Sequence, residues 1–270
     1  MTMIDPALLL SAYAQGLFPM SDSANDPAIH WVEPRLRAIL PLDAFRLSRS
    51  LRKLLISDRM TVTTNRCFSR MMQLCAEPAA DRPSTWINPI IHRSYAQLHA
   101  IGHAHSVECW QDGALVGGLY GVSLGRVFFG ESMVSRIPNA SKVALAHLVA
   151  RLTVGGWQLL DCQFMTPHLA SLGAIEMPQR RYLDRLYSVL SGAAGEGAAG
   201  AGAAVAGAEA AEAPSWPLPD PPAPPFAAGD WTALDALASA LPASPAGPAD
   251  GGATASPPGY VIAQLLTNTS

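Results

Sequence analysis

The chain has 270 residues, enough for one or two domains, and 49% of them are hydrophobic, which is ample for a buried core. No apolar run reaches membrane-spanning length, the first sixteen residues lack a signal-peptide pattern, and the four cysteines contain no C-x-x-C pair. We therefore expect a reduced, cytoplasmic protein with no membrane segment. We expect no metal site either, because His103 and His105 lack further ligands at a suitable spacing.

Charge is distributed unevenly along the chain. All 18 Lys and Arg residues precede residue 190 and seven of the 21 acids follow it, which leaves residues 1–190 with 14 acids and a net charge of +4. Basic residues are densest between positions 46 and 70, where Asp58 is the single acid. Such a run is typical of a phosphate-binding surface or of a solvated helix face, and composition leaves both open.

The first half of the chain predicts helices over residues 6–15, 48–56, 65–75 and 88–101, with strands over 36–40 and 61–64. Asn88-Pro89 is a good N-cap followed by proline at the first helical position, and Gly102 suits the end of that helix. We expect Asn65 to cap the helix that follows it.

The second half predicts three antiparallel strands over residues 105–110, 114–122 and 126–129, the first two joined by a tight turn at Asp112-Gly113. A helix should begin at Asn139 or Ser141 and end at Gly155, before a strand over residues 157–163 and a last helix over 181–190. This order predicts an α+β architecture in which helices cover an antiparallel-rich sheet.

Residues 191–270 form an acidic tail rich in Ala, Gly and Pro. Such a composition buries too little apolar surface to offset the entropy of ordering, so we expect most of the tail to be disordered. A chain ended after Asp220 should therefore stay active. Two islands stand out: residues 216–219 could dock on the folded part, and residues 231–241 could form a transient helix.

Eight short motifs point to a known family. They are YAQGLFP from Tyr13, WI from Trp86, GHAHSVE from Gly102, GGLYGV from Gly117, GESM from Gly130, NASK from Asn139, DCQ from Asp161 and ASLGA from Ala170. Together they resemble the leucyl/phenylalanyl-tRNA–protein transferase family over about residues 8–190.

The resemblance implies a small N-terminal domain (residues 1–40), a catalytic domain similar to the Gcn5-related N-acetyltransferase fold (41–190) and a tail outside the family pattern (191–270). It also implies transfer of Leu, Phe or Met from an aminoacyl-tRNA to the N-terminal Arg or Lys of an acceptor protein, which marks that protein for degradation by the N-degron pathway. Neither a metal nor another cofactor is implied, and we expect a monomer.

The reaction is aminolysis of an activated ester, so the enzyme mainly has to position two substrates and handle a proton. Asp161 and Gln163 lie two apart and would share one face of a strand. Asp161 would hold the incoming amine, and the Gln163 amide oxygen would accept a hydrogen bond from it. Glu131 would sit where the substrates meet. The alternatives are structural: a helix cap for Asp161, a backbone partner for Gln163, and an ion pair with Arg126 or Arg136 for Glu131.

The resemblance also implies an apolar pocket for the aminoacyl side chain, formed by Trp86, Leu119, Phe128, Leu148, Leu152 and Leu160. A basic surface would hold the tRNA acceptor stem through Arg46, Arg49, Arg52, Lys53, Arg82 and Lys142.

Two other functions compete with this one. An acetyl-CoA-dependent N-acetyltransferase would need a glycine-containing pyrophosphate loop, and residues 134–145 contain no such glycines. A tRNA-binding module without enzymatic activity would bind tRNA but modify no peptide.

Overall fold

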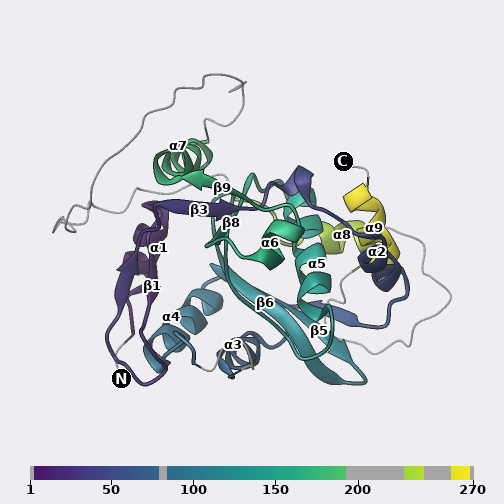
Figure 1. The fold of residues 1–270 in the computed structure, drawn as a ribbon, viewed down its shortest axis with the longest axis horizontal. Coiled ribbons are helices and arrows are strands. Elements are labelled where there is room, and N and C mark those ends of the chain that lie inside the picture. The colour runs from purple at the N-terminus through teal and green to yellow at the C-terminus, as the bar shows by residue number, and fades with distance from the viewer. Residues whose placement is uncertain (1–2, 79–83, 193–227, 240–256, 268–270) are drawn as a thin grey trace.

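A computed structural model describes residues 3–78, 84–192, 228–239 and 257–267 (Figure 1). The described residues form a mixed α/β architecture around a seven-stranded sheet of order β4-β5-β6-β7-β8-β3-β9. Its strands are β3 (Leu36–Ile39), β4 (Thr61–Thr64), β5 (Ala104–Gln111), β6 (Ala114–Leu124), β7 (Val127–Ser135), β8 (Leu159–Gln163) and β9 (Ile175–Pro178). A separate hairpin pairs β1 (Phe18–Met20) with β2 (His30–Val32).

Helices cover both faces of the large sheet. They are α1 (Pro6–Ala14), α2 (Arg49–Ile56), α3 (Phe68–Ala76), α4 (Pro89–Ala100), α5 (Ala140–Val154), α6 (Pro167–Ser171), α7 (Gln179–Leu190), α8 (Ala233–Ser239) and α9 (Gly259–Thr267), with a 3-10 turn η1 (Leu42–Ala44). One core contains side chains from α2, α5, α8 and α9, and a second contains side chains from α1, α3, α4 and α7. The predicted α+β layering and antiparallel meander β5-β6-β7 are confirmed, whereas β9 and the β1–β2 hairpin were not predicted.

The position of the site follows from one parallel strand pair. Strands β7 and β8 are paired from Val127 opposite Leu159 to Phe129 opposite Asp161, and their pairing ends there. Both strands continue past that point, to Ser135 and to Gln163. Beyond that point β7 stays paired with β6 and β8 with β3, so β7 and β8 diverge from each other and frame a gap between them.

Two of the predicted helix caps do not form their side-chain hydrogen bond, although Asn139 does occupy the N-cap position of α5. Asn65 has a positive φ of 58° and its side chain accepts a hydrogen bond from the Ser106 backbone amide, so it does not cap α3. Asn139 precedes α5 but makes no side-chain cap, and the Ser135 hydroxyl instead accepts from the Ser141 amide. In both cases a residue of a neighbouring strand, Ser106 or Ser135, makes a hydrogen bond that replaces the expected cap. The cap predicted at Asn88 is confirmed, since its side chain accepts from the Ile91 amide.

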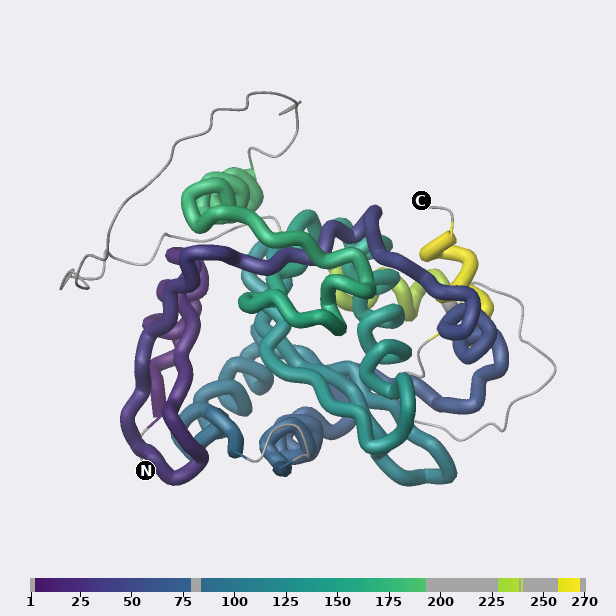
Figure 2. Tube along the Cα trace, in the orientation of Figure 1, coloured from purple at the N-terminus to yellow at the C-terminus, as the bar shows by residue number. Residues whose placement is uncertain are grey.

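The C-terminal tail is not structureless where the structure describes it. Helix α8 falls within the island predicted over residues 231–241, and α9 was not predicted. Leu234 of α8 and Ile262 of α9 are buried in the same core as side chains of α5 and α2. The backbone trace shows residues 259–267 of α9 beside α2 (Figure 2). The island at residues 216–219 lies outside the described residues. Helices α8 and α9 are therefore ordered parts of a tail that was expected to be mostly disordered.

Candidate functional site

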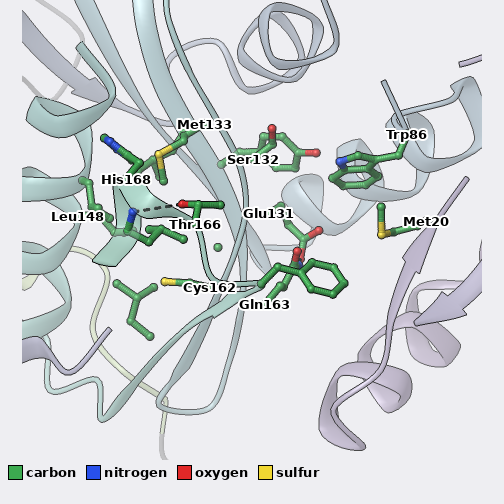
Figure 3. A pocket seen from close by; sticks show the side chains of 17 residues that line it. Met20, Trp86, Glu131, Ser132, Met133, Leu148, Cys162, Gln163, Thr166 and His168 are labelled. Atoms are coloured by element: carbon green, nitrogen blue, oxygen red, sulfur yellow. Dashed lines mark hydrogen bonds between the residues drawn. The ribbon is translucent and has the colours of Figure 1, made fainter. Parts of the chain in front are cut away.

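A cavity of about 330 Å³ opens where β7 and β8 separate. It is lined by Met20, Trp86, Leu119, Tyr120, Gly130, Glu131, Ser132, Met133, Leu145, Leu148, Leu160, Cys162, Gln163, Phe164, Thr166, His168 and Leu169. Figure 3 shows Leu148 and Met133 on one side of this cavity and Trp86 and Met20 on the other, with Glu131 and Gln163 between them. Most of the lining is thus apolar, with Glu131 and Gln163 together and Ser132, Thr166 and His168 as the other polar side chains, and such a mixture is common in ligand pockets.

Four of the six residues expected in the apolar pocket line this cavity: Trp86, Leu119, Leu148 and Leu160. Phe128 and Leu152 do not line it; both are fully buried in the core on the α5 side of the sheet. Neither residue belongs to one of the eight motifs, and the resemblance could not distinguish the wall of a pocket from the layer behind that wall.

Glu131 is the buried acid of the cavity. Its Oε1 accepts hydrogen bonds from the Tyr13 hydroxyl (2.7 Å) and from Gln163 Nε2 (2.8 Å), and its Oε2 accepts from the Tyr95 hydroxyl (3.0 Å). The Tyr13 and Tyr95 hydroxyl oxygens are also in contact; each hydroxyl has a single proton, so a hydrogen bond between them forms only when one of the two does not donate to Glu131. The alternative of an ion pair with Arg126 or Arg136 is not what the structure shows, since Arg136 pairs with Glu77 instead.

Burial raises the pKa of Glu131 to about 7, although the hydrogen bonds from Tyr13, Tyr95 and Gln163 act to lower it. Asp161 contributes a smaller electrostatic increase to the same pKa. Burial likewise raises the pKa of both tyrosines well above their usual value, so they remain neutral hydrogen-bond donors. The site holds a carboxyl group whose ionisation falls in the physiological range.

This pKa shift predicts a stability effect. The folded chain binds more protons than the unfolded chain between the ordinary pKa of 4.5 and the folded value of about 7, so the free energy of unfolding should fall as pH rises through that window. The full effect at Glu131 should be about 3 kcal/mol. Glu131→Gln should remove it, and denaturant unfolding at pH 5 and pH 8 would measure the difference.

The exposed Glu176 provides the matched control, because Glu176→Gln makes the same chemical change at the surface. We expect Glu176→Gln to keep the wild-type dependence of stability on pH. An equal dependence in wild type and Glu131→Gln would show that Glu131 does not titrate in this window.

Gln163 ends β8 in an unusual backbone conformation. Its φ is 63°, which is uncommon for a residue other than glycine and is found most often at functional sites. Its backbone amide donates to Asp161 Oδ1 at 2.7 Å, which holds this turn in place. In the structure Gln163 faces Glu131 with its NH₂ group, which is the orientation that an ionised carboxylate requires because it only accepts hydrogen bonds, and its Oε1 is left for another donor.

Asp161 does not face the cavity as expected. Its side chain is 0% exposed and forms an ion pair with Arg37, whose Nε and Nη2 approach the carboxylate at 2.6–3.0 Å. The Tyr182 hydroxyl donates to the same carboxylate at 2.7 Å. These partners, together with the Gln163 amide, surround Asp161, so direct contact with an incoming amine is not possible in this arrangement. The positive φ of Gln163 is the reason that strand alternation failed to predict the two directions.

Several functional residues were missed from the sequence. Tyr13 and Tyr95 hold Glu131, whereas Arg37 and Tyr182 hold Asp161. Tyr13 belongs to a quoted motif, so a signal existed for it. The other three lie outside those motifs and reach the site from α4, β3 and α7.

The predicted tRNA-binding residues are distributed over several elements. Arg49, Arg52 and Lys53 lie exposed on α2, and Arg46 is exposed just before it. Within the described part of the chain, none of these four forms an ion pair. Lys142 is half-buried in the first turn of α5, and Arg82 lies outside the described residues. The alternative of a solvated helix face therefore stays open for α2.

Other groups with metal-ligand or acid–base chemistry lie away from the cavity. Asp22, Asp26 and His30 place ligand atoms within 4.8 Å of one another near the exposed N-terminal hairpin, an arrangement common without any ion. His105 is structural, as expected: its Nδ1 hydrogen-bonds to Asn65 at 3.0 Å, and burial lowers its pKa to about 3. Among the described residues, the helices are too short or too polar to cross a membrane.

An apolar cavity that ends in a buried glutamate and a strained glutamine, on an α/β scaffold, defines an enzyme-like site for a substrate with an apolar group. Comparison with known proteins identifies the family. The family model "Leucyl/phenylalanyl-tRNA protein transferase" matches residues 39–187, and the model of that family's N-terminal domain matches residues 2–35. The chain belongs to the leucyl/phenylalanyl-tRNA protein transferase family.

Individual relatives agree with the family model. A protein named leucyl/phenylalanyl-tRNA--protein transferase from Zymomonas mobilis is 64% identical over 189 residues, which cover 70% of each chain. One of the same name from Rhizorhabdus wittichii is 60% identical over 195 residues, covering 72% of this chain and 79% of the relative. One from Novosphingobium aromaticivorans is 49% identical over 276 residues, covering 99% of this chain and 97% of the relative.

Proposed function

We propose that this protein transfers an apolar amino acid from an aminoacyl-tRNA to the N-terminus of an acceptor protein. Leu, Phe and Met are the amino acids proposed, and Arg or Lys the acceptor N-terminal residues. The observation that carries the proposal is the apolar cavity that ends at Glu131 and Gln163 in a chain of this family. The acetyl-CoA-dependent alternative has no comparable support.

The cavity suits the aminoacyl side chain. Leu119, Leu148 and Leu160 would contact an apolar chain, and Trp86 and Met20 lie across the cavity from Leu148 (Figure 3). The ester would then lie near the polar end. In the reaction the acceptor's α-amine nitrogen forms a bond to the ester carbonyl carbon. The bond between that carbon and the ribose oxygen breaks, and the amine proton passes to the ribose oxygen.

Gln163 would orient the amine. Because its NH₂ group donates to Glu131, its Oε1 is free to accept a hydrogen bond from the α-amine and direct the nitrogen lone pair at the ester. Glu131 would act at the junction of the two substrates by holding this amide orientation. Asp161 becomes a positioning residue in this scheme, because it holds the backbone of Gln163 and does not touch the amine.

A covalent serine intermediate is not part of the proposal. Ser132 lines the cavity, but GESM lacks the strand-to-helix elbow that activates a serine nucleophile, and β7 continues through it to Ser135. The aminoacyl ester is already activated, so direct transfer needs no such intermediate.

Exposed arginine and lysine side chains would hold the tRNA backbone. Replacing Arg49, Arg52 and Lys53 together with Gln should weaken tRNA binding and flatten its salt dependence by roughly one unit of slope per lost phosphate contact. Filter binding or fluorescence anisotropy over a salt series would measure this change.

Helix α7 offers a control with the same change in charge. Arg180, Arg181 and Arg185 are exposed there, away from α2 (Figure 1). Replacing these three with Gln should change the salt dependence less than the α2 variant does. Equal slopes for the two triple variants would assign α2 to a solvated face.

Several finer statements complete the proposal. We propose that residues 41–190 resemble the Gcn5-related N-acetyltransferase fold, which the separating parallel pair β7–β8 supports. A distinct N-terminal domain over residues 1–40 is supported by the family model that matches residues 2–35. We further propose a cytoplasmic monomer that uses no cofactor and marks its acceptor proteins for degradation by the N-degron pathway.

A direct assay tests the proposed function. Purified protein, leucyl-tRNA with a labelled amino acid, and a peptide that begins with Arg should yield a labelled peptide, whereas a peptide that begins with Ala should stay unlabelled. Coenzyme A should give no thermal stabilisation. Binding of tRNA without any labelled peptide would contradict the transferase and favour a tRNA-binding module.

A further inference from the structure

Helix α5 is covered on the side away from the sheet by residues from the end of the chain. Its residues from Val143 to Leu152 are buried on every side, although one face would suffice to pack on the sheet. The layer outside α5 comes from α8 and α9, which lie beside it in Figure 1. Residues 228–239, which contain α8, are called the C-terminal clasp below.

A buried ion pair fixes the clasp to α5. Arg151 is 1% exposed, and its guanidinium donates to both carboxylate oxygens of Asp235 at 2.8 and 2.6 Å and to the backbone oxygen of Trp231. A charged side chain at this depth is costly unless it is paired. The partner lies 84 residues further along the chain.

The backbone of the clasp also fits closely. The Asp230 amide donates to the Gly155 carbonyl at 2.9 Å, and the Gly229 amide donates to the Gly125 carbonyl at 3.1 Å. A Cβ atom on Gly229 would lie 2.3 Å from Trp157 Cδ2, so only glycine fits there without a shift. Such close contacts are typical of a specific docking site.

Trp231 joins the clasp to the layer behind the cavity. Its ring stacks on His105 with centroids 4.0 Å apart and on Phe128 with centroids 5.7 Å apart. Phe128 lies directly opposite Leu160 in the β7–β8 ladder, and Leu160 lines the cavity. Arg151, which Trp231 also contacts, is three residues from the cavity residue Leu148 on α5.

We propose that the C-terminal clasp sets the depth of the aminoacyl pocket, with Trp231 as a specificity-determining residue that acts through Phe128, Leu160 and α5. This inference rests on the proposed function. Tight packing transmits changes in volume because interiors have little free space, so removal of the Trp231 ring would let the layer behind the cavity relax backwards. A deeper pocket would favour phenylalanine over the smaller leucine.

The test compares kcat/KM for phenylalanyl-tRNA and leucyl-tRNA with one acceptor peptide. In the full-length chain, Trp231→Ala should raise the Phe-to-Leu ratio by about fivefold or more, in the range that pocket contacts of this size can give. KM for the acceptor peptide should stay unchanged. Trp231→Phe keeps an aromatic ring against Phe128 and should therefore have a Phe-to-Leu ratio close to that of the wild type.

Leu237→Ala is the matched control, because Leu237 lies in the same clasp, in α8, but is exposed. It should leave the ratio as in wild type. If Trp231→Ala does not fold, Trp231→Leu is measured in its place and is expected to change the ratio in the same direction.

The outcomes separate the two proposals. An inactive wild-type protein would contradict the proposed function itself. If the wild type is active, two results would overturn the role of the clasp in specificity and leave the proposed function intact. The first is a Phe-to-Leu ratio that does not change in the Trp231 variants. The second is an equal loss of activity with both tRNAs, accompanied by a lowered melting temperature.

Discussion

Replacing Gln163 with alanine should lower kcat/KM for transfer by about 10²–10⁴-fold, the range typical of groups that position or relay a proton. The affinity for aminoacyl-tRNA should be nearly unchanged, because the apolar walls and the basic surface are intact. Single-turnover kinetics together with a binding assay would separate the two quantities. Gln111→Ala, at an exposed position of the β5–β6 hairpin, should keep full activity.

The charge of the side chain can be tested at the same position. Gln163→Glu removes the donor to Glu131 and places a second carboxylate where a 2.8 Å hydrogen bond stood. Two like charges so close raise the pKa of one carboxyl group, so the variant should lose rate and show a shifted pH profile. A fully active Gln163→Glu enzyme with the wild-type profile would leave the chemistry to the substrates themselves.

The second large effect concerns stability. Asp161→Ala should lower the free energy of unfolding by about 3–5 kcal/mol, because it leaves the Arg37 guanidinium buried without its carboxylate. Denaturant unfolding would measure this loss. Asp184→Ala removes an exposed aspartate on α7 and should change stability little.

A double variant separates stability from activity. Arg37→Met combined with Asp161→Leu replaces the buried pair with apolar side chains, a change that is often neutral or stabilising. We expect this variant to regain most of the stability and yet to transfer slowly, because the Gln163 backbone has lost its acceptor. Full activity in the double variant would reduce Asp161 to scaffolding.

The structure changes the result expected from truncation of the tail. The sequence predicts that a chain ended after Asp220 stays active, but such a chain lacks Asp235 and Trp231. Arg151 would then lose its carboxylate partner, and the apolar side chains of α5 that α8 and α9 cover would be exposed to water. We therefore expect a destabilised protein.

Local patterns explain which elements could be predicted. The cap at Asn88 and the hairpin turn at Gly113 depend on neighbours in the chain, and the structure has them where expected. The strand expected over residues 126–129 instead continues through GESM to Ser135 as β7. The caps predicted at Asn65 and Asn139 failed because Ser106 and Ser135, from adjacent strands, supply the competing hydrogen bonds. An interpretation based on local sequence cannot weigh such partners.

The candidate site was predictable in part for the same reason. Glu131 and Gln163, which were selected from the family motifs, do line the cavity. The direction in which the Asp161 side chain points depends on its partner Arg37, which is 124 residues away in the sequence. The burial of α5 on all sides did carry a signal. A helix without a polar face, such as the run from Val143 to Leu152, indicates a further layer, which here comes from the tail.

The long sequence separation of the site contacts has a consequence for synthesis on the ribosome. Tyr13 meets Glu131 across 118 residues, and Arg37 meets Asp161 across 124. Contacts of this kind form late, because distant segments must be brought together before they stabilise one another. Tyr182, which completes the surroundings of Asp161, is translated later still. A nascent chain therefore has no assembled site until the segment that contains Tyr182 has emerged from the ribosome.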